Sequence, residues 1–179
     1  MERYRIGISA CLCGWNVRYD GGHRYAPHII ETLGRFCEWV PVCPEVEYGL
    51  PTPRNAMRLT GDPAAPRLMT IATGDDHTEG MLAWAAERLS ALGKQHLSGF
   101  IFKSRSPSSG MAGVPVYDRD GNVVGKGAGL FAATLMRAFP DLPVAEDEEL
   151  QDPARRELFL EEVRAYRRRK SRAGKNRKD

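Results

Sequence analysis

Short apolar segments alternate with amphipathic segments along most of this chain, and that alternation restricts the possible folds more than any other feature. The segments expected to form the main strands are 4–10, 38–43, 97–102 and 141–146. The segments expected to form helices are 27–37, 75–95, 128–139 and 152–169. A peripheral strand is expected at 67–74, and a hairpin at 114–127 that turns at Asp120 and Gly121. Because strands that alternate with helices form a parallel sheet covered on both faces, the chain is predicted to be an α/β protein.

The length of 179 residues indicates one domain with an extension. We expect residues 1–150 to form the α/β domain and residues 151–179 to form a C-terminal helix that ends in a basic tail. No apolar run approaches the ~20 residues that a membrane span requires. Residues 1–10 also lack the basic and apolar segments of a signal peptide. A cytoplasmic location without a membrane partner is therefore predicted.

Positive charge is concentrated at the end of the chain. Nine Lys or Arg residues and one acid lie between Arg164 and Asp179, although the net charge of the whole chain is only +3. Charged terminal segments usually fray into solvent, and we expect this tail to do so. The alternative is a salt-dependent contact with RNA, although no aromatic side chain after Tyr166 is available for base stacking.

Polar segments follow three of the expected strands. Cys11 follows strand 4–10, Cys43 ends strand 38–43, and KSRSPSSG (103–110) follows strand 97–102. Open parallel sheets bind ligands beyond the carboxyl ends of their strands, where the strand order reverses. We therefore expect the three segments to meet at one cleft. The glycine-rich segment 125–131 is a weak candidate for a phosphate cradle, because it follows a hairpin.

The four cysteines, at positions 11, 13, 37 and 43, all lie in the first quarter of the chain. Disulfides are disfavoured in a cytosol, so metal binding or catalysis is favoured as the role of these thiols. Cys37 lies in an apolar context and is expected in the core. Zinc is disfavoured, because the four histidines are scattered. A redox role for Cys11 with Cys13 is a weaker alternative, because their loop is poor in cations.

Three motifs in a fixed order carry a family resemblance. They are ISACLCGWNVRYDG (8–21), VPVCPEVEYGLPTPR (40–54) and FKSRSPSSG (102–110). Together they resemble the motifs of a bacterial family, the thiouracil desulfurases or thiouridylate desulfidases, over about residues 3–146. The resemblance implies a three-layer, Rossmann-like α/β fold. It also implies a [4Fe-4S] cluster held by three cysteines, with one open iron that takes up the sulfur of a thiocarbonyl in a non-redox desulfuration that releases hydrosulfide.

The resemblance also implies roles for residues of this chain. Cys11 and Cys43 match the first two cluster ligands, Glu45 matches the catalytic glutamate, and Ser106 matches the catalytic serine. The implied substrate is a small thiolated uracil compound, either 4-thiouridine monophosphate or thiouracil. The residue types suit this chemistry, because a carboxylate can activate water and a hydroxyl can relay a proton.

The chain departs from the family at the third cluster ligand. The family motif ends in SPSCG and this chain has SPSSG, so Ser109 occupies the position of the cysteine. A hydroxyl is a poor replacement, because clusters are held by soft thiolates. Three interpretations stay open: an engineered substitution, a natural variant with weakened function, or coordination completed by Cys13. We expect an impaired enzyme with an absent or labile cluster. The alternative is a cluster-deficient nucleotide- or RNA-binding module without catalysis.

Substrate contacts are expected from the same loops. Arg18, Tyr19 and Asp20 continue the first motif, although Asp20 with Gly21 is also typical of a plain turn. The further candidates, from the serine-rich segment, are Lys103 and Arg105 for a substrate phosphate, and Ser108.

Overall fold

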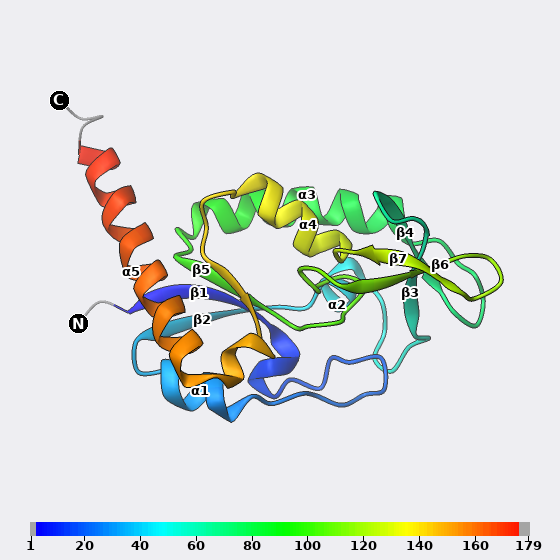
Figure 1. Cartoon of the computed structure of the whole chain (residues 1–179), viewed down its shortest axis with the longest axis horizontal. Helices are drawn as coiled ribbons and strands as arrows, with labels where there is room; N and C mark the ends of the chain where they lie inside the picture. The colour runs from blue at the N-terminus through cyan, green and yellow to red at the C-terminus, as the bar shows by residue number, and fades with distance from the viewer. Residues whose placement is uncertain (1–2, 176–179) are drawn as a thin grey trace.

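Four parallel strands form the central sheet of the protein, whose computed structural model describes residues 3–175. The strands are β1 (Tyr4–Ser9), β2 (Cys37–Val42), β5 (Gly99–Phe102) and β8 (Val144–Glu146). They lie in the order β2-β1-β5-β8, so the chain passes from β1 to one side for β2 and returns to the other side for β5 (Figure 1). The predicted parallel sheet is confirmed, and its strand order reverses beside β1.

Helices cover both faces of this sheet, as expected for a three-layer, Rossmann-like fold. One face is covered by α1 (Pro27–Leu33) and α5 (Pro153–Lys175), and the other by α3 (Thr78–Lys94) and α4 (Leu130–Ala138). Alternate side chains of β5 show the two faces, because Ile101 packs with α1 and α5 whereas Phe100 and Phe102 pack with α3 and α4. A strand buried on both faces needs such a continuous apolar run, and the sequence GFIF supplies it.

A second sheet lies beside the first and was not expected. It contains β3 (Met57–Asp62), β4 (Ala65–Thr70), β6 (Val114–Tyr117) and β7 (Val123–Gly127), in the order β4-β3-β6-β7. The hairpin at 114–127 is confirmed, but the peripheral strand pairs with β3, which the sequence analysis missed. β3 is mostly polar, and its burial depends on Leu59, which packs with Met81 of α3 and Leu130 of α4.

The segment after Cys43, expected to be a loop, begins with the short helix α2 (Pro44–Tyr48). Pro44 occupies the first turn, and Gly49 ends the helix with a positive φ of 116°. Both are ordinary helix-boundary residues, but five residues are too few to show a helical period. Two 3₁₀ helices, η1 (Ala10–Cys13) and η2 (Glu149–Gln151), complete the elements.

The C-terminal helix is part of the core for half of its length. Phe159 and Val163 of α5 are buried in the apolar cluster that contains α1, so the helix is not a separate appendage up to that point. The expected fraying is not seen before Lys175, because the basic segment continues as helix and extends away from the body (Figure 1). Residues 176–179 of the predicted tail lie outside the described residues. Within the described range, no helix is both long and apolar enough to span a membrane.

Candidate functional site

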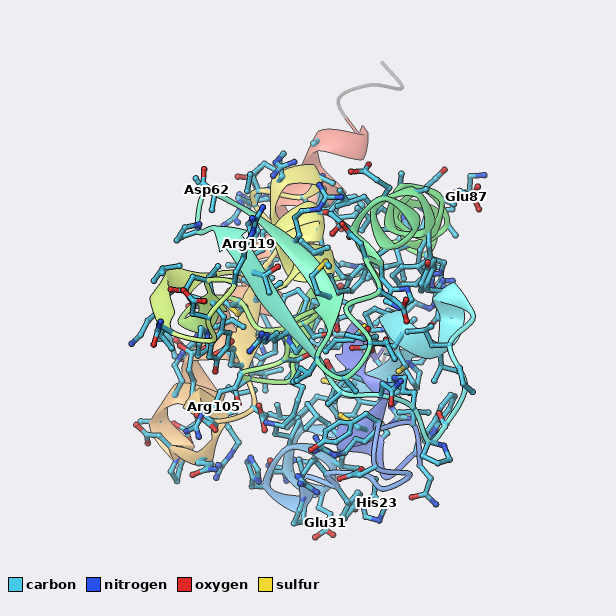
Figure 2. The ribbon with its side chains drawn as sticks, turned by 90° about the vertical axis from the view of Figure 1, so that its right-hand side faces the viewer. His23, Glu31, Asp62, Glu87, Arg105 and Arg119 are labelled. Atoms are coloured by element: carbon cyan, nitrogen blue, oxygen red, sulfur yellow. The ribbon has the colours of Figure 1, made fainter. Side chains whose placement is uncertain are left out.

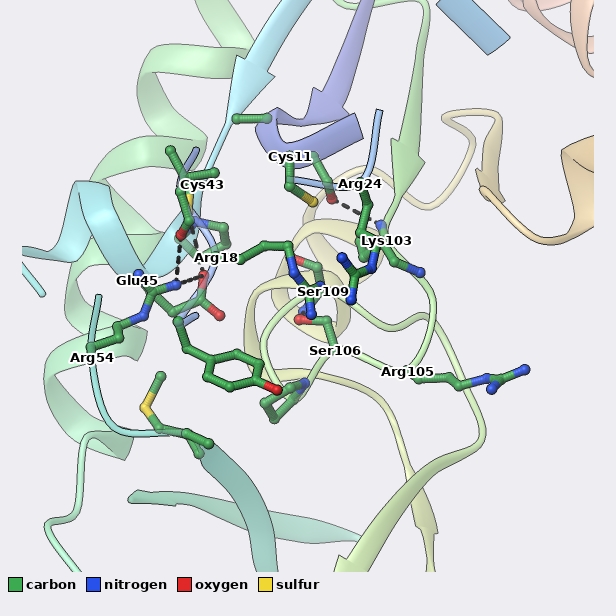
Figure 3. Close-up of a pocket in the computed structure, with 18 of the residues that line it drawn as sticks. Cys11, Arg18, Arg24, Cys43, Glu45, Arg54, Lys103, Arg105, Ser106 and Ser109 are labelled. Atoms are coloured by element: carbon green, nitrogen blue, oxygen red, sulfur yellow. Dashed lines mark hydrogen bonds and ion pairs between the residues drawn. The ribbon is translucent and has the colours of Figure 1, made fainter. Parts of the chain in front are cut away.

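The carboxyl ends of β1, β2 and β5 surround a cavity of about 640 Å³, beside the reversal in strand order. Three loops form most of its wall, and residues 54–57, Ile71 and Glu148 complete it (Figure 3). Cys11 comes from the first loop, Cys43 and Glu45 come from the second, and Ser106 and Ser109 come from the third. All five line the same cavity, as the sequence predicted for residues at neighbouring strand ends; their roles stay predictions.

In the first loop, η1 begins directly after β1 and separates the two cysteines. Cys11 is 8% exposed and lines the cavity. Cys13 does not line it, and packs instead against the apolar cluster that includes α1. A 3₁₀ helix has three residues per turn, so residues two apart point in different directions. The structure therefore gives no support to Cys13 as a substitute ligand.

In the second loop, Cys43 and Glu45 lie beside a buried arginine. The Cys43 thiol lies 3.6 Å from Glu45 Oε2. Arg54 Nη2 lies 3.9 Å from the same carboxylate oxygen and donates a hydrogen bond of 2.9 Å to the Val17 carbonyl. The side chains of Arg54 and Glu45 are only 7% and 12% exposed, so solvent screens this ion pair weakly. Arg54 therefore joins the first and second loops at the cavity wall.

The third loop, residues 103–110, is called the serine loop, and the N-terminus of α4 holds it in place. The Phe131 N–H donates to the Ser108 carbonyl at 2.9 Å, and the Gly129 N–H donates to the Gly110 carbonyl at 2.8 Å. A Cβ at Gly129 would lie 2.4 Å from the Ser108 carbonyl carbon, so only glycine permits this approach. Because the serine loop occupies these amides, the glycine-rich segment before α4 is not an open phosphate cradle.

Three hydroxyls and a carboxylate form a hydrogen-bonded network behind the cavity wall. The Ser108 hydroxyl donates to Glu45 Oε1 at 2.6 Å. Its oxygen lies 3.1 Å from Ser106 Oγ and 3.4 Å from Ser109 Oγ. Ser108 is 0% exposed and does not line the cavity, so the structure gives no support to a direct contact between Ser108 and substrate. It connects residues that do line the cavity.

Five cationic side chains line the cavity, and four of them have carboxylate partners. Lys103 Nζ lies 3.0 Å from Asp147, and Arg105 lies 3.0 Å from Glu148. The other two pairs are Arg18 with Asp20, at 3.4 Å, and Arg54 with Glu45. In the described part of the chain, Arg24 has no carboxylate within ion-pair distance.

Only some of the residues predicted to contact substrate line the cavity. Arg18 and Tyr19 line the cavity as expected, whereas Asp20 does not. Arg105 is largely exposed and points away from Ser106 and Ser109 (Figure 3). The sequence analysis missed Arg24 and Arg54. Arg54 closes the second motif, which was its one available signal, whereas nothing in the local pattern marks Arg24.

Burial makes the thiols of the first two loops weak nucleophiles. Desolvation raises the pKa of the Cys11 thiol to about 11, although Lys103 and Arg18 oppose the shift. Desolvation, followed by the charge of Glu45, raises the pKa of the Cys43 thiol to about 12. The pKa of Cys13 is also raised, to about 11, mainly by burial. A reactive redox thiol has a lowered pKa, so the redox alternative for Cys11 with Cys13 loses support.

The fold and the cavity define an α/β protein with a cavity at the reversal of strand order. The profile of the 2-thiouracil desulfurase family matches residues 6–147, and the chain belongs to that family. It is 32% identical over 155 residues to the uncharacterized protein YbbK of Bacillus subtilis (strain 168), covering 82% of this chain and 98% of YbbK. Its structure is similar to that of the [4Fe-4S]-dependent thiouracil desulfidase TudS, with a TM-score of 0.63, 30% identity, and coverage of 85% of this chain and 96% of TudS. The resemblance inferred from the three motifs is confirmed.

The donor set of the cavity does not match a cluster held by three thiolates. Cys11 and Cys43 supply two thiols, but Ser109 stands at the third position, with its hydroxyl against Ser108. Within residues 3–175, no group of three or more His, Cys, Asp or Glu side chains is arranged to hold a metal ion. Iron in such clusters takes soft thiolates, and a serine hydroxyl is hard and protonated at neutral pH. The residues present are one thiolate short of the three-cysteine set that the resemblance implies.

Proposed function

We propose that the cavity binds a thiolated uracil compound and that this chain is built for the desulfuration reaction of its family. In that reaction the thiocarbonyl sulfur is replaced by oxygen from water, and hydrosulfide is released. The observation that carries the proposal is the meeting of Glu45 and Ser106 beside Cys11 and Cys43 at one cavity wall. The likeness to a thiouracil desulfidase over 85% of the chain supports it.

Glu45 and Ser106 have complementary roles in the proposal. Glu45 takes a proton from the water that attacks the ring carbon, and Ser106 supplies a proton to the departing sulfur. Each such proton transfer contributes about 100-fold to 10,000-fold to a rate when the groups are positioned. The Ser106 oxygen is positioned here by the Ser109 N–H, which donates to it at 3.1 Å. Its hydroxyl proton remains available for the network or for a ligand.

The size and charge of the cavity favour a nucleotide over a free base. A volume of about 640 Å³ lies within the usual range for small-molecule sites, which is about 300–1,000 Å³. Arg24 lines the wall without a carboxylate partner in the described part of the chain, whereas Lys103 and Arg105 are paired with acids. Arg24 is therefore the side chain proposed to meet the phosphate of 4-thiouridine monophosphate.

A titration of the chain with 4-thiouridine monophosphate and with 4-thiouridine tests this choice. Arg24→Gln is expected to weaken binding of the monophosphate about tenfold, or about 1.4 kcal/mol, and to leave binding of the nucleoside unchanged. Arg119→Gln is the matched control, because Arg119 lies on the hairpin of the second sheet, away from the cavity (Figure 2). Equal weakening of both ligands, or of neither, would assign the phosphate to another residue.

The missing thiolate is proposed to limit the unmodified chain to a labile or absent cluster and to weak turnover. After anaerobic reconstitution with iron and sulfide, we expect little bound iron or acid-labile sulfide in the unmodified chain. Ser109→Cys is expected to raise both toward four per chain and to give sulfide release from 4-thiouridine monophosphate or thiouracil. Ser98→Cys is the control, because Ser98 is equally buried but lies outside the cavity. An unmodified chain with a full cluster and rapid turnover would refute the impairment.

A second candidate function is binding of a thiolated nucleotide without catalysis. The observation that favours it is Ser109, which keeps the cavity intact but leaves two thiols. Binding of the nucleotide, together with no iron and no sulfide release even after Ser109→Cys, would select this function. The comparisons give no support to an RNA contact through the basic helix, so RNA is not part of the proposal.

A further inference from the structure

We infer that Ser108 is a positioning residue that joins Glu45 to Ser106 in one directed chain of hydroxyl groups. Ser108 is fully buried and does not line the cavity, so it acts through its two neighbours and not on a ligand. The inference rests on the proposed function, in which Glu45 and Ser106 are the groups that exchange protons with the reactants. It adds the path by which the proton travels between them.

The direction of the chain follows from counting donors and acceptors. An ionised carboxylate only accepts, so the single hydroxyl proton of Ser108 is donated to Glu45 Oε1, at 2.6 Å. The Ser108 oxygen is then free to accept the hydroxyl proton of Ser106, at 3.1 Å. The Ser106 oxygen itself accepts the backbone N–H groups of Ser109 and Ser108, at 3.1 and 3.4 Å. With Glu45 ionised, the order Ser106 to Ser108 to Glu45 satisfies every one of these groups.

Protonation of Glu45 reverses this order. When Glu45 accepts a proton from the attacking water, its new O–H donates to Ser108, and Ser108 donates to Ser106. Ser106 can then donate to the sulfur as the carbon–sulfur bond breaks. In the whole exchange of thiocarbonyl and water for carbonyl and hydrogen sulfide, both O–H bonds of water are broken and two S–H bonds are formed, so it balances without an oxidant or a reductant. The chain of hydroxyls carries one of these two protons.

The backbone keeps the three oxygens at these distances. The carbonyl of Ser108 accepts the N–H groups of both Phe131 and Ala132, at 2.9 and 3.1 Å, so Ser108 is anchored on the first turn of α4. Glu45 is anchored on α2 and held from the other side by Arg54. The two ends of the chain of hydroxyls therefore rest on two helices, and a change of side-chain proton order needs no movement of the backbone.

The Ser108→Ala substitution tests the inference, and it is made both in the unmodified chain and in the Ser109→Cys variant. In whichever of these two backgrounds releases sulfide, we expect Ser108→Ala to lower kcat about 100-fold and to leave KM and ligand affinity unchanged. Ser108→Thr, which keeps a hydroxyl, is expected to recover most of the rate. Ser98→Ala removes another buried serine, outside the cavity, and is expected to leave kcat unchanged.

The outcomes separate this inference from the function on which it rests. Unchanged kcat in Ser108→Ala would overturn the positioning role and leave the proposed function standing. No sulfide release from any variant, including Ser109→Cys, would overturn both. If Ser108→Ala does not fold, the inference is tested by measuring kcat in mixtures of H₂O and D₂O, with the sulfide-releasing protein that retains Ser108. Two or more protons in transit predict a curved dependence of kcat on the deuterium fraction, and a straight line would contradict the chain of hydroxyls.

Discussion

Among the single residues of the site, Arg54 joins segments that are distant in the sequence. Its guanidinium contacts the Val17 carbonyl and Glu45, and its backbone N–H donates to the Tyr19 carbonyl at 2.9 Å. A buried cation is tolerated only with such partners, because an unpaired buried charge costs several kcal/mol. Replacement of Arg54 would therefore disturb the first loop and Glu45 together.

The four thiols, two buried and two half-buried, give the stability of the protein a defined dependence on pH. Desolvation is the main cause that raises the pKa of all four thiols from 9.0, to about 11 for Cys11 and Cys13 and about 12 for Cys37 and Cys43. Because the native state holds these protons more tightly than the unfolded chain, each thiol stabilises the native state below about pH 9. That contribution is lost as the pH rises from about 9 toward 11 or 12.

We therefore expect the free energy of unfolding, measured with guanidinium under reducing conditions, to fall between about pH 8 and about pH 10.5. Cys37→Ala removes one of the thiols with the larger shift, outside the cavity, and should make this fall smaller, although the variant starts from a lower stability. The slope of the free energy of unfolding against pH is compared between the two proteins, because the contributions of tyrosines and lysines are common to both and cancel. Equal slopes in the two proteins would contradict the assignment.

At the scale of the element, the contact between the serine loop and α4 decides the geometry of the site. The first-turn N–H groups of a helix have no partner within the helix, and here the carbonyls of the serine loop accept several of them. This arrangement satisfies the helix end and fixes Ser106, Ser108 and Ser109 in the same step. Gly129 is the point of closest approach between the two segments.

Gly129→Ala is expected to destabilise the protein by about 1–3 kcal/mol, because its Cβ would meet backbone atoms that cannot move aside. It should also weaken nucleotide binding, since the serine loop must shift. Gly93→Ala is the control. Gly93 lies within α3, and a Cβ there would meet only the Phe139 ring, at 3.7 Å. Alanine also favours a helix over glycine by up to about 1 kcal/mol. Thermal unfolding and ligand titration of both variants provide the test, and equal stability would count against the contact.

At the scale of the whole molecule, α5 completes the core although it lies beyond the family match. Phe159 is 1% exposed and Val163 is fully buried, both in the apolar cluster with β1 and α1. Tyr166 packs in the cluster with α3 and α4. The exposed basic part of α5 follows these residues, so the helix has a structural first half and a solvated second half.

Phe159→Ala is expected to lower the free energy of unfolding by about 3–5 kcal/mol, through lost burial and a cavity in the core. Leu158→Ala, at the neighbouring and 49% exposed position, should change stability by no more than about 0.5 kcal/mol. Denaturant unfolding of the two variants gives the comparison. Similar losses in both would show that α5 does not pack as described.

The sequence by itself determined the parallel sheet, the helices on both faces and the three segments that form the site. Each of these follows from a local pattern: an apolar run, a helical stripe, or a polar residue directly after a strand. It also exposed the serine at position 109, because a change of one atom within a motif is visible without a structure. Neither β3 nor α2 was found, since β3 is mostly polar, α2 has only five residues, and both depend on neighbours from distant segments.

Only the tertiary structure decided which polar groups face the ligand and which support them. Lys103 pairs with Asp147 and Arg105 pairs with Glu148, each more than forty positions further along the chain. These carboxylates partly neutralise the positive charges of Lys103 and Arg105. Ser108 is turned away from the cavity toward Glu45, because α4 holds its backbone, and Arg24 remains at the wall without a carboxylate partner among the described residues. Such pairings depend on distances between loops, and a linear sequence contains residue types but no distances.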